Sequence, residues 1–188
     1  MRKVISHLIM TLDGVIQFDA VHQEIAELRE NKEVLEDFFS KVENEDSMLL
    51  GRTTYEEWKD YWPTSEVQPF SDHINSTKKY VFSNSLEKVS WGDWNNIVLF
   101  QNDHFEKVHE LKKQDGKNIG VHGSGTLVQS LIYANILDEL RLEIYPVVSG
   151  SGRRLFSENS AIKSFTLSNQ KITSNGVAIL TYKPAKNA

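Results

Sequence analysis

The sequence predicts an α/β protein of three layers, α/β/α, whose central and mostly parallel sheet ends in an antiparallel C-terminal hairpin. Along most of the chain, short β-branched and apolar runs alternate with segments of helical spacing. This alternation is typical of a parallel sheet that helices cover on both faces. Two of the runs end in glycine turns that lead into helices, and the last two flank Ser174-Asn175-Gly176, which favours a hairpin turn.

The chain begins with a strand and a long helical region. The apolar run over residues 4–10 predicts a buried strand, which ends at the turn signal Asp13-Gly14. Apolar side chains recur at helical spacing over residues 22–43, and Asn31 is suited to cap a second piece of that region. The solvated end of this helical region is expected to carry the acidic residues Glu43, Glu45 and Asp46.

A second strand and helix follow, and then a loop. Residues 47–50 predict a strand that stops at Gly51, and Thr53 or Thr54 is expected to cap the next helix. The two prolines that follow mark an irregular loop. Further strands are predicted over residues 79–83, 96–100, 118–122 and 140–148, helices over 104–114 and 126–135, and hairpin strands over 165–173 and 177–183.

Length and composition fit one globular domain over residues 1–188, of which 39% are hydrophobic and 25% charged. The net charge of -5 argues against a broad nucleic-acid surface, and no apolar run approaches the roughly 18 residues of a membrane span. The absence of Cys excludes a thiol nucleophile and fits a reducing, cytoplasmic compartment. The six His residues show no metal-ligand spacing, so no metal site is predicted.

The strongest local feature is the segment Gly123-Ser124-Gly125-Thr126 between a strand and a helix. Glycines let the backbone approach a phosphate, and a helix N-terminus offers unpaired N–H groups. A tight turn with Thr126 as helix cap explains the same residues equally well. His122, beside this turn, is expected to be structural, and Glu143 is taken as part of an apolar strand.

A similar turn, Gly51-Arg52-Thr53, adds a cation that can pair with a phosphate. A surface arginine beside a helix cap is the alternative. Ligands of such sheets bind at the carboxyl ends of the strands, and two glycine turns at strand ends therefore favour an anionic ligand. Ser83 and Asn84 follow another strand and offer small polar groups, and the basic loop of residues 150–154 either contacts an anion or simply turns the chain.

Several segments in order along the chain resemble the RibD C-terminal, dihydrofolate-reductase-like family. No single motif is decisive, but their joint occurrence is specific. The matching segments are Thr11-Leu12-Asp13-Gly14, Leu50-Gly51-Arg52-Thr53-Thr54-Tyr55, Tyr80-Val81-Phe82-Ser83, His122-Gly123-Ser124-Gly125-Thr126-Leu127, Leu137-Asp138-Glu139-Leu140-Arg141-Leu142 and the stretch from Tyr145 to Phe156.

The resemblance implies a dihydrofolate-reductase-like fold, NADPH as cofactor and hydride transfer to a small heterocyclic, pterin- or pyrimidine-like substrate, as in the uracil reductase of riboflavin biosynthesis. A homodimer is also expected, because the strand over residues 140–148 and the terminal hairpin offer a sheet edge that should be covered and because the relatives often pair. The cofactor-binding residues implied are Ile9, Thr11, Gly14, Gly51, Arg52, Thr53, Ser83, Asn84, Gly123, Ser124, Gly125 and Thr126. Asp13, near the implied nicotinamide end, is the candidate catalytic proton donor, and a turn role is its alternative.

Three departures from the family narrow the prediction. Leu35 falls where dihydrofolate reductases carry a carboxylate, so dihydrofolate is expected to be a poor substrate. The zinc deaminase half of the bifunctional riboflavin enzyme needs Cys ligands and is absent. Asn84 replaces a basic residue that relatives often have, which weakens the preference for NADPH over NADH. A true dihydrofolate reductase and a non-catalytic NADP(H)-binding protein remain the alternatives.

Overall fold

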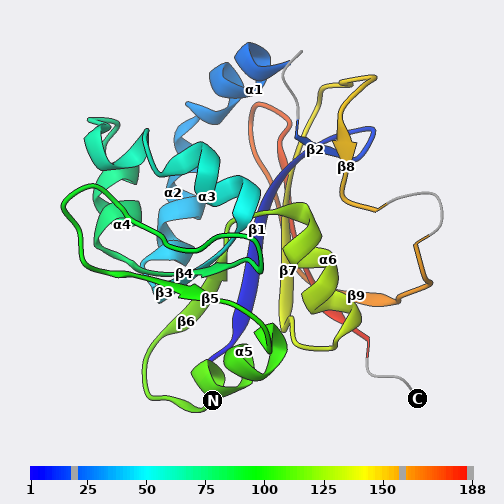
Figure 1. Ribbon diagram of the computed structural model, residues 1–188. Helices are drawn as coiled ribbons and strands as arrows, with labels where there is room; N and C mark the ends of the chain where they lie inside the picture. Colours follow the sequence, from blue (N-terminus) through cyan, green and yellow to red (C-terminus); the bar gives the residue numbers. More distant parts are fainter. Residues whose placement is uncertain (18–20, 157–159, 186–188) are drawn as a thin grey trace.

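The computed structural model describes residues 1–17, 21–156 and 160–185, and its centre is an eight-stranded sheet (Figure 1). The strand order is β5-β4-β3-β6-β1-β7-β10-β9. The strands from β5 to β7 in this order pair in parallel, whereas β10 is antiparallel to both neighbours. The expected parallel sheet with an antiparallel C-terminal hairpin is confirmed. The strands are β1 (Val4–Thr11), β3 (Glu45–Gly51), β4 (Lys78–Phe82), β5 (Ile97–Phe100), β6 (Asn118–Val121), β7 (Glu139–Tyr145), β9 (Phe165–Ile172) and β10 (Ala178–Pro184).

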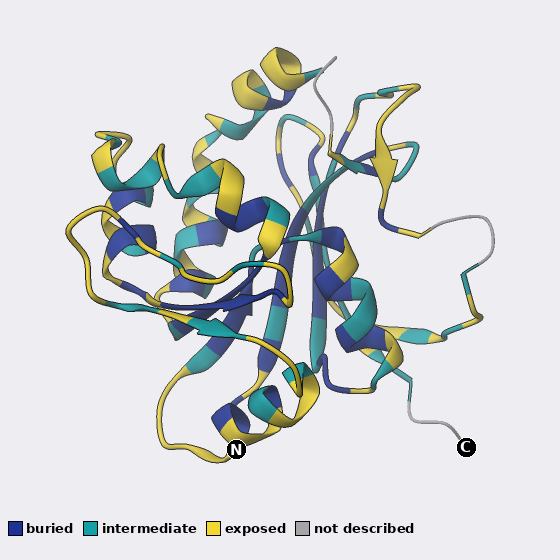
Figure 2. Cartoon of the chain, in the orientation of Figure 1, coloured by how far each residue is buried: buried dark blue, intermediate teal, exposed yellow. Residues whose placement is uncertain are grey.

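Helices cover both faces of this sheet, which gives the expected three layers. On one face, Val108 and Leu131 belong to an apolar cluster with the sheet, and on the other Tyr55 and Ile74 belong to a second. Figure 2 shows that buried residues concentrate in the sheet and on the helix sides that face it. The first face carries α5 (His104–Lys113) and α6 (Gly125–Tyr133), and the second carries α1 (His22–Arg29), α2 (Lys32–Val42), α3 (Arg52–Trp58) and α4 (Phe70–Ser76).

The helical region of residues 22–43 divides at the expected place. The Asn31 side chain accepts a hydrogen bond from the Glu33 N–H at 2.8 Å and so caps α2. Two other capping predictions are wrong, because α3 begins directly at Arg52 with Gly51 as its cap residue, and α6 begins at Gly125, before Thr126. In both helices the chain turns from strand to helix without a side-chain cap.

The segment expected as an irregular loop contains a short 3₁₀ turn, η1 (Trp62–Thr64), and the helix α4. Pro69 precedes the first residue of α4, a position where the ring does not interrupt a helical hydrogen bond. Burial of Ile74 against the sheet stabilises this helix, and seven residues are too few for a clear helical period in the sequence.

Two short strands, β2 (Val15–Gln17) and β8 (Arg153–Arg154), form a separate antiparallel pair that the sequence did not predict. This pair joins the segment after β1 to the basic loop after β7. β7 ends at Tyr145, before the predicted strand end, and lies inside the sheet between β1 and β10. No helix in the described part of the chain has the length and apolar character needed to cross a bilayer.

Candidate functional site

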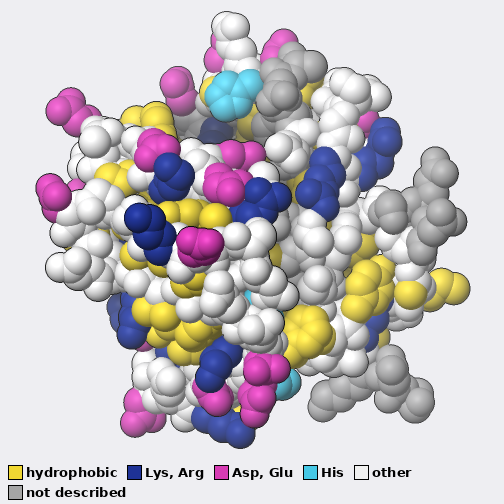
Figure 3. Space-filling view, viewed as in Figure 1, with side chains coloured by type: hydrophobic (Ala, Val, Ile, Leu, Met, Phe, Trp, Pro, Cys, Tyr) yellow, Lys and Arg dark blue, Asp and Glu magenta, His cyan; other side chains and the backbone are white. Residues whose placement is uncertain are grey.

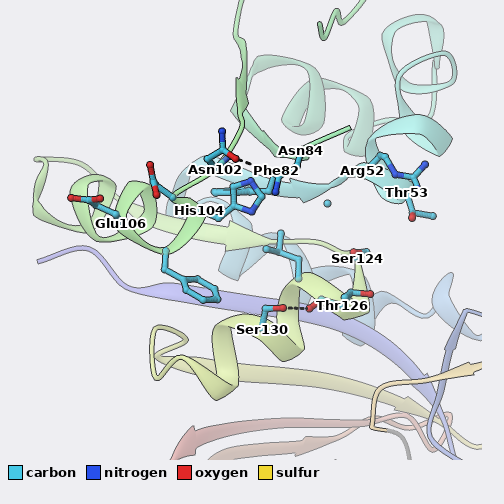
Figure 4. Close-up of a pocket in the computed structure, with 14 residues that line it drawn as sticks. Arg52, Thr53, Phe82, Asn84, Asn102, His104, Glu106, Ser124, Thr126 and Ser130 are labelled. Carbon is cyan, nitrogen blue, oxygen red and sulfur yellow. Dashed lines mark hydrogen bonds between the residues drawn. The ribbon is translucent and has the colours of Figure 1, made fainter. Parts of the chain in front are cut away.

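Three adjoining cavities lie over the carboxyl ends of the parallel strands. The outer cavity, of about 660 Å³, lies between the two glycine turns and the start of α5 (Figure 4). The middle cavity, of about 150 Å³, shares Thr53 and Ser124 with the outer one. The inner cavity, of about 230 Å³, shares Leu8, Ile16, Trp58 and His122 with the middle one. Because each cavity shares walls with the next, the three form one elongated cleft.

The two glycine turns touch each other at the wall shared by the outer and middle cavities. The Gly51 N–H donates to the Gly123 carbonyl oxygen at 3.2 Å. A Cβ atom on Gly51 would lie 2.4 Å from the Ser124 Oγ, so a side chain at this position would force Ser124 to move. The first turn of α6, which starts at Gly125, therefore faces the cleft with N–H groups that have no partners within the helix.

Cations stand on both sides of these turns. Arg52 lines the outer cavity, its side chain is half exposed, and its Nη1 contacts the Glu56 carboxylate at 2.7 Å. Arg153, which the sequence left as either an anion contact or a loop residue, lines the middle cavity and donates to the Thr126 Oγ1. Free N–H groups of a helix start together with flanking arginines are suited to a phosphate-bearing ligand.

The strand end at residues 83–84 contributes to the outer cavity through one of its two predicted residues. Asn84 lines the cavity, and its Oδ1 accepts a hydrogen bond from the Asn102 N–H at 2.9 Å. Ser83 is buried, and its Oγ accepts hydrogen bonds from the N–H groups of Ser85 and Leu86, both at 3.2 Å. Its hydroxyl therefore shapes the turn and does not line the cavity.

The opposite wall of the outer cavity comes from residues that the sequence did not single out. Asn102 and Asp103 have left-handed backbone conformations, with φ of 56° and 46°, and they turn the chain from β5 into α5. Figure 4 shows Asn102, His104 and Glu106 across the cavity from Arg52 and Thr53. Asn and Asp tolerate this conformation better than most residues. The pair Asn102-Asp103 directly before a predicted helix was therefore the sequence signal that could have indicated this turn.

The predicted residues at the end of β1 divide into two groups. Ile9 lines the inner cavity. Thr11, Asp13 and Gly14 line none of the three cavities and instead form the turn between β1 and β2. The Asp13 carboxylate accepts hydrogen bonds from the Thr11 hydroxyl at 2.6 Å and from the N–H groups of Ser149 and Gly150 at 3.1 and 3.0 Å.

These contacts bear on the candidate role of Asp13 as proton donor. The hydrogen bond from Thr11, followed by that from the Ser149 backbone, lowers the pKa of Asp13 to about 2. The carboxyl group is therefore ionised at neutral pH and has no proton to give. The geometry favours the alternative role, in which Asp13 fixes the loop of residues 149–154 against β1.

The inner cavity has aromatic walls and a polar floor. Arg29 lies over the Phe70 ring, with its guanidinium carbon 4.8 Å from the ring centroid, and closes one side. A flat ring that enters between such walls is stacked and shielded from water. The aromatic walls are Phe38, Trp58, Trp62 and Phe70, and the polar floor consists of His7, His73, His122 and Glu143.

The α2 face towards this cavity carries Phe38, whereas Leu35 is absent from its lining. The carboxylates of α2 have other partners, since Asp37 pairs with Arg141 and Glu33 accepts from the Ser174 N–H at 2.6 Å. An acid enters the cavity from β7 instead. Glu143 is buried and accepts a hydrogen bond from the Tyr145 hydroxyl at 3.3 Å. The sequence did not indicate that Glu143 lines the cavity, because it lies within an apolar strand pattern.

Glu45 does not belong to a solvated helix end, and this expectation is wrong. Its side chain is 1% exposed, and its two oxygens contact the Nε2 atoms of His7 and His122 at 2.6 and 3.0 Å. The two imidazole rings are stacked, with centroids 5.2 Å apart. Burial acts to raise the pKa of Glu45, but the charges and hydrogen bonds of the two histidines outweigh it and lower the pKa to about 2.

The backbone explains why the sequence pattern missed this group. The register of β3 against β6 shifts between Glu45 and Ser47, and such a bulge breaks the alternation of side chains on a strand. On β6, Gly120 has no side chain where the carboxylate lies, because a Cβ there would be 2.0 Å from the Glu45 Oε2. A third imidazole, His73, faces His122 edge-on, and burial, followed by the charge of His122, lowers the pKa of His73 to about 4.

Comparison with known proteins agrees with this architecture. The family model for the RibD C-terminal domain matches residues 2–180. The chain belongs to the RibD C-terminal domain family. The uncharacterized Bacillus subtilis (strain 168) protein YyaP is 31% identical over 187 residues, which cover 96% of this chain and 94% of YyaP.

Solved structures share the RibD C-terminal fold at low sequence identity. A Shewanella sp. PV-4 protein, provisionally named as a riboflavin biosynthesis protein, superposes with a TM-score of 0.80 at 19% identity and covers 98% of this chain and 99% of its own. Dihydrofolate reductase from Enterococcus faecalis, complexed with NADP(H), gives a TM-score of 0.63 at 13% identity, with 98% and 97% of the two chains covered. These likenesses confirm the dihydrofolate-reductase-like fold.

Proposed function

We propose that this RibD C-terminal family protein is an NADPH-dependent oxidoreductase that reduces a C=N or C=O bond in a small heterocyclic, pterin- or pyrimidine-like substrate. The observation that carries the proposal is the continuous cleft, which joins an anion-suited outer cavity to an aromatic inner cavity. Relatives in fold support it, since one is a dihydrofolate reductase complexed with NADP(H) and another is a riboflavin biosynthesis reductase of Saccharomyces.

The donor set of the outer and middle cavities fits a pyrophosphate. Gly51 and Gly123 allow the backbone to approach closely, and the α6 start at Gly125 and Thr126 supplies N–H donors. Arg153 adds positive charge from the middle cavity, and Arg52 adds it from the outer cavity, on the side of the adenosine end. Asn84 and the segment of residues 102–106 remain for the adenosine end, in the part of the outer cavity farther from the middle one.

When bound, NADPH supplies the hydride, and the protein contributes alignment and exclusion of water. Trp58, Ile16 and Leu8 line both the middle and inner cavities, where donor and acceptor rings would meet. Phe38 and Phe70 hold a planar ring from one side of the inner cavity. Glu143 and the histidines of its floor provide hydrogen-bond partners for ring nitrogens and carbonyl oxygens.

Calorimetry with NADPH tests the cofactor part of the proposal, and one site per chain is expected. A ligand at 100 times its Kd adds about 2.7 kcal/mol to stability, so the melting temperature should rise by several degrees. Gly125→Val fills the space at the start of α6 and should weaken binding at least tenfold, or about 1.4 kcal/mol. Gly176→Asn, in the distant hairpin turn, is the control and should bind normally, because asparagine tolerates the φ of 85° there better than most residues do. Absence of binding to the wild type rejects the proposal.

Cofactor consumption tests turnover. NADPH oxidation is measured with a panel of pterins, flavin precursors of the pyrimidine type and aldehydes. Dihydrofolate is expected to be poor, because no carboxylate of α2 lines the inner cavity. A kcat/KM at or above about 10⁴ M⁻¹s⁻¹ for dihydrofolate would indicate a true dihydrofolate reductase instead. Tight NADPH binding without turnover of any panel member would favour the non-catalytic alternative.

A further inference from the structure

A buried cluster of one carboxylate and three imidazoles lies at the floor of the inner cavity. Its members come from separate elements: His7 from β1, Glu45 from β3, His73 from α4, and His122 from the residue after β6. The ligand-type atoms of Glu45, His73 and His122 all lie within 4.8 Å of one another. The proposed hydride transfer does not require this concentration of metal-ligand side chains.

The hydrogen bonds within the cluster leave some of its polar atoms without partners. Glu45 is the one acid among four residues, and both of its oxygens are already engaged by His7 and His122. The His73 Nε2 and the His7 Nδ1 are fully buried and have no hydrogen-bond partner among the residues that the structure describes. A buried nitrogen without a partner is unfavourable, and a bound cation would use the free lone pair of His73.

We propose that Glu45, His73 and His122 bind one divalent transition-metal ion of the zinc type. One carboxylate oxygen and two imidazole nitrogens are a common donor set for Zn²⁺ in sites that keep an open position. Ligand bonds of about 2.0–2.2 Å in tetrahedral geometry place two ligand atoms about 3.3–3.6 Å apart. The Glu45 Oε2 and His122 Nε2 are already 3.0 Å apart, so His73, on the short helix α4, makes most of the adjustment.

Two neighbours support the ligands. His7 contacts the other Glu45 oxygen at 2.6 Å, and such an outer hydrogen bond fixes the orientation of a ligating carboxylate. Gly120 leaves open the space beside the site, because a Cβ there would lie 2.0 Å from the Glu45 Oε2 and 2.7 Å from the His122 Nε2. Both features hold the carboxylate and an imidazole at ligand distance without a side chain between them.

The site opens into the inner cavity, which His73 and His122 line. The ion's remaining position therefore faces the space that the proposed function gives to the substrate. A water molecule or a carbonyl oxygen or ring nitrogen of a small ligand would complete the coordination. The site would thus select ligands with such a donor atom. Zinc binding itself does not depend on the proposed NADPH site.

The experiment is calorimetric titration of the chelator-treated, dialysed protein with zinc chloride, supported by elemental analysis. One zinc per chain is expected. His73→Asn and His122→Asn should each weaken binding at least tenfold, whereas His109→Asn, an exposed histidine on α5, should leave it unchanged. Cobalt(II) should produce visible absorption bands of a nitrogen- and oxygen-ligated site in the wild type and lose them in His73→Asn.

Circular dichroism melting of each variant shows whether it is folded. If His122→Asn does not fold, His73→Asn alone tests the site, because His73 is only partly buried. Zinc that fails to bind with one-to-one stoichiometry, or that binds equally well after the His73 substitution, overturns the site. NADPH calorimetry is run separately on the zinc-free protein. Loss of the proposed cofactor site and loss of the metal site are therefore distinguished.

Discussion

At the scale of single residues, Lys79 shows how burial alone changes a side chain's chemistry. It lies on β4 and is fully buried, with its Nζ donating to the carbonyl oxygens of Thr77 and Asn75 at 2.7 and 3.0 Å. The Nζ is 4.7 Å from the centroid of the Trp91 ring. Removal of the ammonium group from water lowers the pKa of Lys79 to about 7.

This shift predicts a pH dependence of stability. Between about pH 7 and about pH 10 the unfolded chain holds a proton on Lys79 that the folded chain has released, so the free energy of unfolding rises with pH. One proton corresponds to a slope of at most about 1.4 kcal/mol per pH unit. Urea unfolding across this range should give a smaller slope for Lys79→Met. Lys78→Met, its exposed neighbour, should keep the wild-type slope; equal slopes in all three proteins would contradict the prediction.

Arg52 is expected to contribute to the choice between NADPH and NADH, which differ by a 2′-phosphate. A charge-assisted hydrogen bond is worth about 1.5–3 kcal/mol, and the half exposure of Arg52 reduces this. Arg52→Ala should therefore weaken NADPH about tenfold more than NADH in calorimetry. Asn84→Arg, which adds a cation to the same cavity, should increase the preference.

Lys59→Ala is the control for Arg52, because this cation lies just after the same helix α3 and is absent from the cleft lining. It should leave the ratio of NADPH to NADH affinity unchanged. If neither Arg52→Ala nor Asn84→Arg changes the ratio, the adenosine end binds elsewhere.

At the scale of elements, the contact between the two glycine turns predicts a steric coupling. Gly51→Ala adds a Cβ 2.4 Å from the Ser124 Oγ, while its φ of -76° suits any residue. Overpacking of this kind costs about 1–3 kcal/mol, and it should also weaken NADPH binding about tenfold by pushing the turns apart. Ser124→Gly in the same chain removes the clash and should restore part of both losses. A double-mutant cycle measures the coupling, and additive effects would argue against it.

The elements with a strong sequence period were predicted, and those fixed by tertiary contacts were not. Strands such as β1, which is largely apolar and β-branched, and the division of α1 from α2 at Asn31 are local properties. The short helix α4 and the pair of β2 with β8 depend on packing between distant segments. Propensity alone gives these little signal.

The same distinction holds for the candidate site. Both glycine turns and Arg52 were singled out because strand ends and glycines are visible in the sequence, whereas Ile9 was named from the family resemblance. The cluster around Glu45 was missed because Glu45 was expected at a helix end, whereas it begins β3 just before a bulge, and the side chain missing at Gly120 makes room for its carboxylate. The aromatic walls come from elements spread over the chain, so no spacing rule brings them together.

At the scale of the whole molecule, the distribution of charged side chains and the exposed edge strands of the sheet determine what the surface can bind. On the face shown in Figure 3, Lys and Arg side chains are interspersed with Asp and Glu, in agreement with the small net charge of -5. The long strand of residues 140–148, which was expected to offer a sheet edge, instead lies inside the sheet as β7. The edge on that side is β9, where Leu167 and Ile172 are 44% and 66% exposed.

An unpaired edge strand with exposed apolar side chains favours association, so a homodimer through β9 is predicted. Light scattering at micromolar concentration should give the mass of two chains. Leu167→Lys should shift it towards one chain, because a lysine on an edge strand opposes pairing. Val148→Lys should not, because Val148 is also apolar and is 62% exposed but lies outside the sheet. A monomeric wild type would contradict the prediction.

The position of β1 in the middle of the sheet also affects how the chain reaches its native state. Val4 pairs with Ile119 on one side, and Ile5 pairs with Glu139 on the other. The first strand to be synthesised therefore has no pairing strand until the second half of the chain, which contains β6 and β7, has been made. Until β6 and β7 exist, an apolar strand is exposed along both of its edges, and such intermediates fold slowly and aggregate easily. The strand that leads into the candidate site is thus also the segment most in need of protection during synthesis.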